Sequence, residues 1–135
     1  AFLRRAGADT AEVKKLFQND LEGTIAKYAI IQNAKLYKEK IAIAVVDHTV
    51  GRVVAAQAAD ELLNIIGIDT SFVLYPDGER IIISARSMGD TNVQVILEKL
   101  GGGGNAAAAG GQIAGKSLSQ VSTELCQAID QYLEG

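Results

Sequence analysis

An arginine with a serine hydroxyl on either side is the first feature of this sequence that indicates chemistry. Ser84, Arg86 and Ser87 follow a β-branched run that is typical of a strand. The planar guanidinium of arginine donates two hydrogen bonds at once, which suits a phosphate group, and the serine hydroxyls add neutral donors. This segment therefore predicts an anion-binding site.

A run of glycines supplies the second half of the predicted site. Gly102, Gly103 and Gly104 precede Asn105. Consecutive glycines exceed what one helix C-cap needs, and glycine lets backbone N–H groups face a ligand. We expect this bend and Arg86 to converge on one concave spot and to bind the phosphate of a nucleotide. The alternative is a glycine-rich helix end beside a surface arginine.

Residues 110–117 match the nucleotide P-loop pattern and end in Lys116 and Ser117. A P-loop must follow a buried strand, whereas this segment follows glycines and alanines. The chain after Ser117 is also too short for a crossover and a second strand that carries a magnesium ligand. The context therefore argues against ATP hydrolysis at this segment.

Asp47 and His48, at the end of a predicted strand, are the pair best placed to ligate a metal. His48 is the only histidine of the chain, and the sequence marks no further carboxylates that would complete the site. No Ser/His/Asp or Cys/His triad is evident either. We therefore expect no metal site and no catalytic residues in this chain.

Composition and charge narrow the class of ligand and the compartment. The net charge of −3 over 135 residues gives no general attraction for a nucleic-acid polymer, which favours a small phosphorylated ligand. The single cysteine, Cys126, excludes an internal disulfide and is consistent with a reducing cytosol. No apolar run approaches the length of a bilayer span.

The periodicity predicts one α/β domain with a mixed central sheet flanked by helices. Residues 41–46 are a continuous apolar run, which we expect to be the central strand, and a helix over 52–66 ends at Gly67. Residues 71–75 and 79–84 should form a β-hairpin around Pro76, Asp77 and Gly78.

Three further helical regions are expected from capping residues and apolar spacing. Thr91 and Gln94 predict a capping box for a helix that ends with Gly101 in the left-handed conformation. Ser117 predicts the cap of a C-terminal helix over 116–133. Two helices, one starting near Asp9 and one at residues 19–20, should precede the sheet. We divide the chain into a connector with helices (1–33) and the main domain (34–135).

Two segments resemble a known family. Residues 102–110 are similar to the GGGH-x-x-AAG signature of the DHH-associated domain of subfamily one. Residues 83–87, followed by 92–94 and 98–101, resemble the membrane-anchored cyclic di-AMP phosphodiesterases of Firmicutes. The resemblance implies a substrate-binding lobe, with the catalytic metals held by a DHH lobe in cis.

The resemblance also implies roles for individual residues. The substrate contacts would come from Ser84, Arg86 and Ser87, and from residues 102–105 of the glycine bend. Asn105 stands where the family usually has histidine, so we expect weaker phosphate binding, or slower turnover in the parent enzyme, than a histidine would give.

The resemblance further implies partners and a location. The ligand would be a cyclic dinucleotide or a short oligonucleotide. Manganese would lie in the DHH lobe, and no cofactor is expected in this chain. The domain would be cytoplasmic, without direct membrane contact, in a membrane-anchored parent protein. Two alternatives stay open: a nano-RNase or RecJ-like domain that acts on short oligonucleotides, and an interaction module that forms a homodimer.

Overall fold

The computed structural model describes residues 10–135, so the first nine residues of the predicted connector, including the helix start near Asp9, lie outside this range. One six-stranded mixed sheet has the order β1-β2-β3-β4-β6-β5. Its strands are β1 (Ala34–Tyr37), β2 (Ile41–Val45), β3 (Thr70–Asp77), β4 (Arg80–Ser87), β5 (Gly103–Gly104) and β6 (Ala108–Ala114). The predicted α/β class with a mixed sheet is confirmed.

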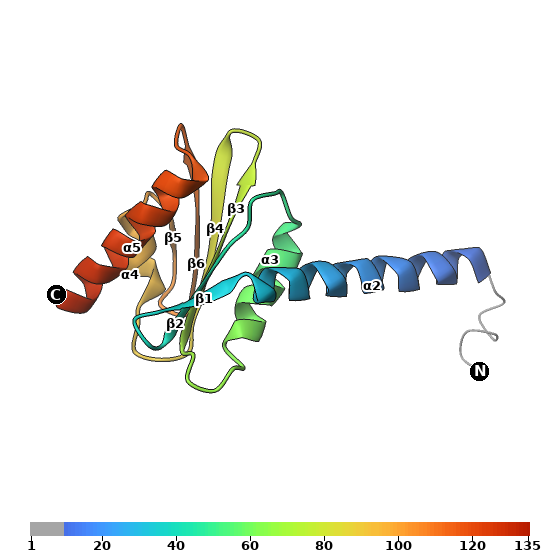
Figure 1. Cartoon of the computed structure of the whole chain (residues 1–135), viewed down its shortest axis with the longest axis horizontal. Helices are drawn as coiled ribbons and strands as arrows, with labels where there is room; N and C mark the ends of the chain where they lie inside the picture. The colour runs from blue at the N-terminus through green and yellow to red at the C-terminus, as the bar shows by residue number, and fades with distance from the viewer. Residues whose placement is uncertain (1–9) are drawn as a thin grey trace.

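Helices cover both faces of the sheet, as Figure 1 shows. One face carries α2 and α3, and the other carries α4 and α5. Each face has its own buried core, because alternate residues of every strand point to opposite sides. The helices are α2 (Thr10–Gln32), α3 (Arg52–Leu62), α4 (Val93–Glu98) and α5 (Leu118–Glu134).

Strand β2 is buried on both faces, as its apolar run predicts. Ile41 and Ile43 join the core under α4 and α5, whereas Ala42 and Ala44 join the core under α3. Strand β2 pairs in parallel with β3, and helix α3 connects the two strands in the sequence. The expectation that it is the central strand is wrong, because β3 and β4 occupy the middle of the sheet. The short strand β1 and the glycine-rich strands β5 and β6 were not predicted, and they extend the sheet at both sides.

Helix α3 is shorter than the sequence predicts. It buries Ala55, Ala58, Ala59 and Leu62. After Leu62 the chain tightens into i→i−3 turns, in which the N–H of Ile65 donates to the Leu62 carbonyl at 3.2 Å. Ile66, which the sequence places in the helix, is therefore outside it and exposed. Gly67 takes a positive φ of 94° in the turn that follows.

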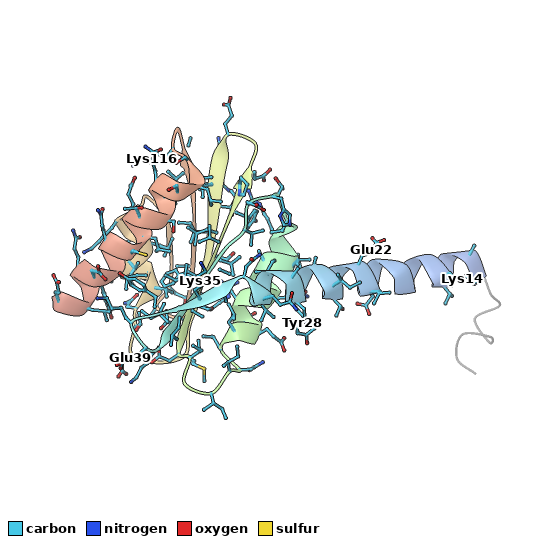
Figure 2. The ribbon with its side chains drawn as sticks, in the orientation of Figure 1. Lys14, Glu22, Tyr28, Lys35, Glu39 and Lys116 are labelled. Atoms are coloured by element: carbon cyan, nitrogen blue, oxygen red, sulfur yellow. The ribbon has the colours of Figure 1, made fainter. Side chains whose placement is uncertain are left out.

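The two predicted leading helices are one continuous helix, α2. Residues 19 and 20 are acceptable helix caps, but nothing in this stretch forces a break. Continuous i→i−4 bonding satisfies N–H and C=O groups that a break would leave unpaired. Figure 2 shows that the part of α2 around Lys14 and Glu22 extends beyond the sheet.

The predicted β3–β4 hairpin is confirmed, with Tyr75 opposite Ile82 and Gly78 at a positive φ of 63°. The capping box of Ser117 and Gln120 at α5 is also confirmed. Among the described residues, no helix combines the length and the apolar character that crossing a bilayer requires.

The cap of α4 differs from the prediction by one residue. The side-chain oxygen of Asn92, not that of Thr91, accepts the backbone N–H groups of Gln94 and Val95, at 3.0 and 3.3 Å. The predicted left-handed conformation of Gly101 is confirmed by its φ of 83°.

Replacing the cap residue Asn92 should lower the stability of the domain, whereas replacing its neighbour Thr91 should not. We expect Asn92→Ala to reduce the free energy of unfolding by about 1 kcal/mol, because two backbone N–H groups lose their acceptor. The matched control Thr91→Ala should stay within about 0.5 kcal/mol of the wild type. Urea denaturation of the three proteins measures both values, and an equal loss in the two variants would contradict the assignment.

Candidate functional site: a glycine-floored pocket

A pocket of about 460 Å³ opens on the face of the sheet that carries α3. Its walls come from the start of α3, from the adjoining ends of β3 and β4, and from the glycine segment. The lining residues are Arg52, Tyr75, Ile82, Ile83, Ser84, Gly101, Gly102, Gly103, Gly110, Gly111 and Gln112. They include one cation and no carboxylate.

The register of the sheet explains why this part of the face is open. Ser84 lies opposite Gly110, and Gly110 lies opposite Gly103. Residues directly opposite one another in a sheet share a face, so these three form one row across β4, β6 and β5. Helix α3 packs on β3 and β4. The two glycines present no side chain at the end of the row, which leaves a floor of bare backbone.

The glycines of the bend serve two different purposes. A Cβ at Gly102 would overlap the backbone carbonyl of Gly110, and a Cβ at Gly104, where φ is 148°, would overlap the backbone of residues 108 and 109. A Cβ at Gly103 would meet nothing within 4 Å. Gly102 and Gly104 are thus required by close backbone packing, whereas at Gly103 the missing side chain keeps the pocket open.

Two backbone N–H groups at the start of the glycine bend have partners within the chain, and one of them, that of Gly102, was predicted to face a ligand. The N–H of Gly101 donates to the Glu98 carbonyl at 3.1 Å, and the N–H of Gly102 donates to the Leu97 carbonyl at 2.8 Å. Both bonds close the C-terminal end of α4. The bend therefore contributes shape to the pocket, and these two donors belong to the helix end.

Asn105 closes the turn between β5 and β6. Its side-chain oxygen accepts the N–H groups of Ala107 and Ala108, both at 2.9 Å, and its own N–H donates to the Ala108 carbonyl at 2.8 Å. Asparagine commonly stabilises tight turns in this way. The amide oxygen is thus committed to the turn, so a ligand contact from Asn105 would come from the amide nitrogen.

Arg86 lies on the same face as Ser84, two residues further along β4, but it does not line the pocket. Its Nε donates to a carboxylate oxygen of Asp60 at 3.1 Å, and its Nη1 donates to the Ala85 carbonyl at 2.9 Å. The side chain is 23% exposed. These contacts hold the guanidinium beside the pocket and leave Nη2 without a partner among the described residues.

Ser87 lies on the opposite face of β4 from Ser84 and Arg86, because adjacent residues of a strand alternate. It is buried, and its hydroxyl oxygen accepts the N–H of Gly89 at 3.4 Å. The structure thus brings Ser84, Gly102 and Gly103 together in the pocket and places Arg86 beside it. It does not bring Ser87 to that face.

Arg52 and Tyr75 line the pocket and were missed by the sequence analysis. Tyr75 is 1% exposed, and its hydroxyl has no hydrogen-bond partner among the described residues. A buried hydroxyl without a partner costs about 1–3 kcal/mol. Burial raises the pKa of Tyr75, the charge of Arg52 opposes this shift, and the charge of Asp77 adds to it, so the hydroxyl carries its proton at neutral pH.

A general rule for α/β sheets could have indicated Arg52 and Tyr75 from the sequence. Strands β2 and β3 are parallel, and in open α/β sheets ligands bind at the carboxyl ends of the strands. Tyr75 lies near the carboxyl end of β3, and Arg52 begins the helix that follows β2.

The other sequence candidates do not form a site in the described part of the chain. Asp47 and His48 are exposed and 3.1 Å apart, and no group of three His, Cys, Asp or Glu residues gathers there to hold a metal. Gly110 and Gly111 of the P-loop match lie within strand β6. Lys116 pairs with Glu124 at 2.7 Å beside the start of α5, on the other side of the sheet from α3 (Figure 2).

Residues 38–135 match the DHHA1 domain family. The whole chain is similar to two curated proteins, each of which it covers for 21% of its length. Identity is 41% over 140 residues to the cyclic-di-AMP phosphodiesterase GdpP of Bacillus subtilis, and 38% over 138 residues to the cyclic-di-AMP phosphodiesterase PdeA of Listeria monocytogenes. The chain therefore spans about a fifth of the length of these relatives.

Solved structures share the fold at lower identity. An exopolyphosphatase-related protein from Bacteroides fragilis superposes with a TM-score of 0.72 at 24% identity, over 82% of this chain and 34% of that one. The pGpG-specific phosphodiesterase PggH from Vibrio cholerae gives a TM-score of 0.61 at 21% identity, over 91% and 43%. The family match over residues 38–135 confirms the resemblance seen in the glycine bend and shows that the chain belongs to the DHHA1 domain family.

Proposed function

We propose that this domain is the substrate-recognition part of a phosphodiesterase that hydrolyses cyclic di-AMP. The glycine-floored pocket carries the proposal. It offers the Ser84 hydroxyl over bare backbone, a cation at its wall and no carboxylate among its lining residues. This combination of shape and charge suits a phosphate group with the sugar or base attached to it.

The similar proteins support the choice of ligand, because GdpP and PdeA are both named as cyclic-di-AMP phosphodiesterases. We further propose that a DHH lobe in cis supplies the reaction chemistry with manganese, since the described residues include no cluster suited to a metal. In this proposal the domain is cytoplasmic and belongs to a membrane-anchored protein.

In the proposed complex, Arg86 contacts a phosphate from the edge of the pocket. Asp60 and the Ala85 carbonyl engage two of its nitrogens and fix the plane of the guanidinium, so little side-chain freedom remains to be lost on binding. The partner-free Nη2 is then available to a phosphate oxygen. Ser84 adds a neutral donor from the same face.

Helix α2 supports the proposal of a partner lobe. Leu21, Ile25 and Tyr28 follow one another at helical spacing, and all three are exposed, by 60%, 60% and 47%. Exposed apolar residues on one helical stripe are typical of a contact with another protein surface. A homodimer would use the same stripe. Titration with cyclic di-AMP distinguishes ligand recognition from such protein contacts.

We predict that the 135-residue chain binds cyclic di-AMP and that Arg86→Ala weakens the affinity by at least about tenfold, because a charge-assisted hydrogen bond to phosphate is lost. Isothermal titration calorimetry with cyclic di-AMP measures the dissociation constants. The control variant Lys116→Ala, which removes a cation on the other side of the sheet, should bind like the wild type.

Three outcomes of this titration would contradict the proposal. Loss of binding in Lys116→Ala with normal binding in Arg86→Ala would favour the P-loop interpretation. A wild-type chain that dimerises at micromolar concentration and binds no dinucleotide would favour the interaction module. Equal losses in Arg86→Ala and Lys116→Ala would indicate attraction by overall charge.

The glycine bend provides a second test that separates ligand binding from folding. Gly103→Val should abolish the binding of cyclic di-AMP with a change in unfolding free energy within about 1 kcal/mol, because the side chain enters the open pocket. Gly104→Ala should instead lower the melting temperature, since its Cβ overlaps the neighbouring strand. Titration and thermal denaturation of both variants measure the two effects. Normal binding by Gly103→Val would place the ligand elsewhere.

A further inference from the structure

The wall of the pocket opposite Arg86 contains a polar group that the fold itself does not use. The Tyr75 hydroxyl is buried and has no partner among the described residues, although Tyr75 lines the pocket. Buried polar groups in native proteins nearly always have partners, so an isolated one at a ligand pocket indicates a partner supplied by the ligand.

Arg52 lies at the same wall. It is the first residue of α3, it lines the pocket, and its charge acts on the Tyr75 phenol. A neutral hydroxyl and a guanidinium are both hydrogen-bond donors. No carboxylate of the described residues lines the pocket, and the charge of Asp77 reaches the phenol from outside the lining. A ligand atom that accepts hydrogen bonds and carries negative charge fits this wall.

We propose that Arg52 and the Tyr75 hydroxyl together bind a second phosphate group of the ligand, so that a dinucleotide spans the glycine floor between this pair and Arg86. The inference rests on the proposed function and extends it, because it requires a ligand with two phosphates. Tyr75 lies opposite Ile82, four residues from Arg86 along β4. At about 3.3 Å per residue, roughly 13 Å of backbone separates the position of Tyr75 from that of Arg86. The long side chains of Arg52 and Arg86 reach over part of this distance.

Tyr75→Phe tests the hydroxyl alone, because the ring that fills the core is kept. The dissociation constant for cyclic di-AMP should rise about tenfold. The midpoint of urea denaturation should stay the same or rise, since an unpaired buried hydroxyl has been removed. An unchanged dissociation constant would overturn the proposal. A lower denaturation midpoint would also overturn it, because the hydroxyl would then have a partner within the fold.

Arg52→Gln should weaken binding at least as much, and Lys116→Gln is its charge-matched control. Lys116 pairs with Glu124 beside the start of α5, on the other side of the sheet from α3, and it does not line the pocket. At 150 mM salt the screening length is about 8 Å, so Lys116→Gln should change the affinity less than threefold. Equal losses in the two variants would overturn a direct contact from Arg52.

The double variant tests whether the two residues bind the same group. If Arg52 and Tyr75 contact one phosphate, Arg52→Gln combined with Tyr75→Phe should lose less affinity than the product of the single losses. Fully additive losses would overturn the shared contact. These outcomes are distinct from a failure of the proposed function, in which the wild-type chain itself would not bind cyclic di-AMP, and which would overturn both.

Discussion

The close approach of two backbones at the glycine bend is the constraint on which the rest of the structure depends. Gly102 packs against the backbone of Gly110 so tightly that no side chain fits between them. This contact lets the chain leave α4, form β5 and return as β6 beside β4. Without it the sheet would lack the strands that build the floor of the pocket. The same glycines that permit the packing also keep the floor free of side chains.

The two faces of the sheet have different tasks as a result. Helices α4 and α5 cover one face with a large apolar core that includes Phe72, Leu97 and Leu125. Helix α3 covers the other face with small residues, mainly alanines, and lies close over β3 and β4. The glycine end of that face holds the open pocket. The pocket thus lies beside the core under α3, on the face opposite the core under α4 and α5.

The sequence predicted the elements whose signals are local. The apolar run of β2, the turn around Gly78 and the capping box of Ser117 each need only neighbouring residues, and all three are present. Strand β1 was missed because four residues are too few for a recognisable period. Strands β5 and β6 were missed because glycine and alanine have weak strand preferences, and the pairing with β4 forms them.

The candidate site likewise contains residues that local patterns identified and residues that they did not. The family signature identified the glycine bend, and the β-branched run identified the strand that carries Ser84 and Arg86. The strand was expected to end at Ser84, and for that reason the alternation that turns Ser87 to the other face was not applied. Arg52 and Tyr75 come from elements far apart in the sequence. Only the parallel pairing of β2 and β3 brings them to one edge, and no local pattern encodes that pairing.

The continuity of α2 has a mechanical consequence. A helix of 23 residues is about 35 Å long and does not bend easily at its middle, so it acts as a stiff lever. A rotation applied at its far end reaches the sheet with little loss. Each residue inserted into or removed from this lever would turn an attached body by about 100° and shift it by about 1.5 Å. The length of α2 therefore sets the angular phase between the sheet and any segment joined to that end.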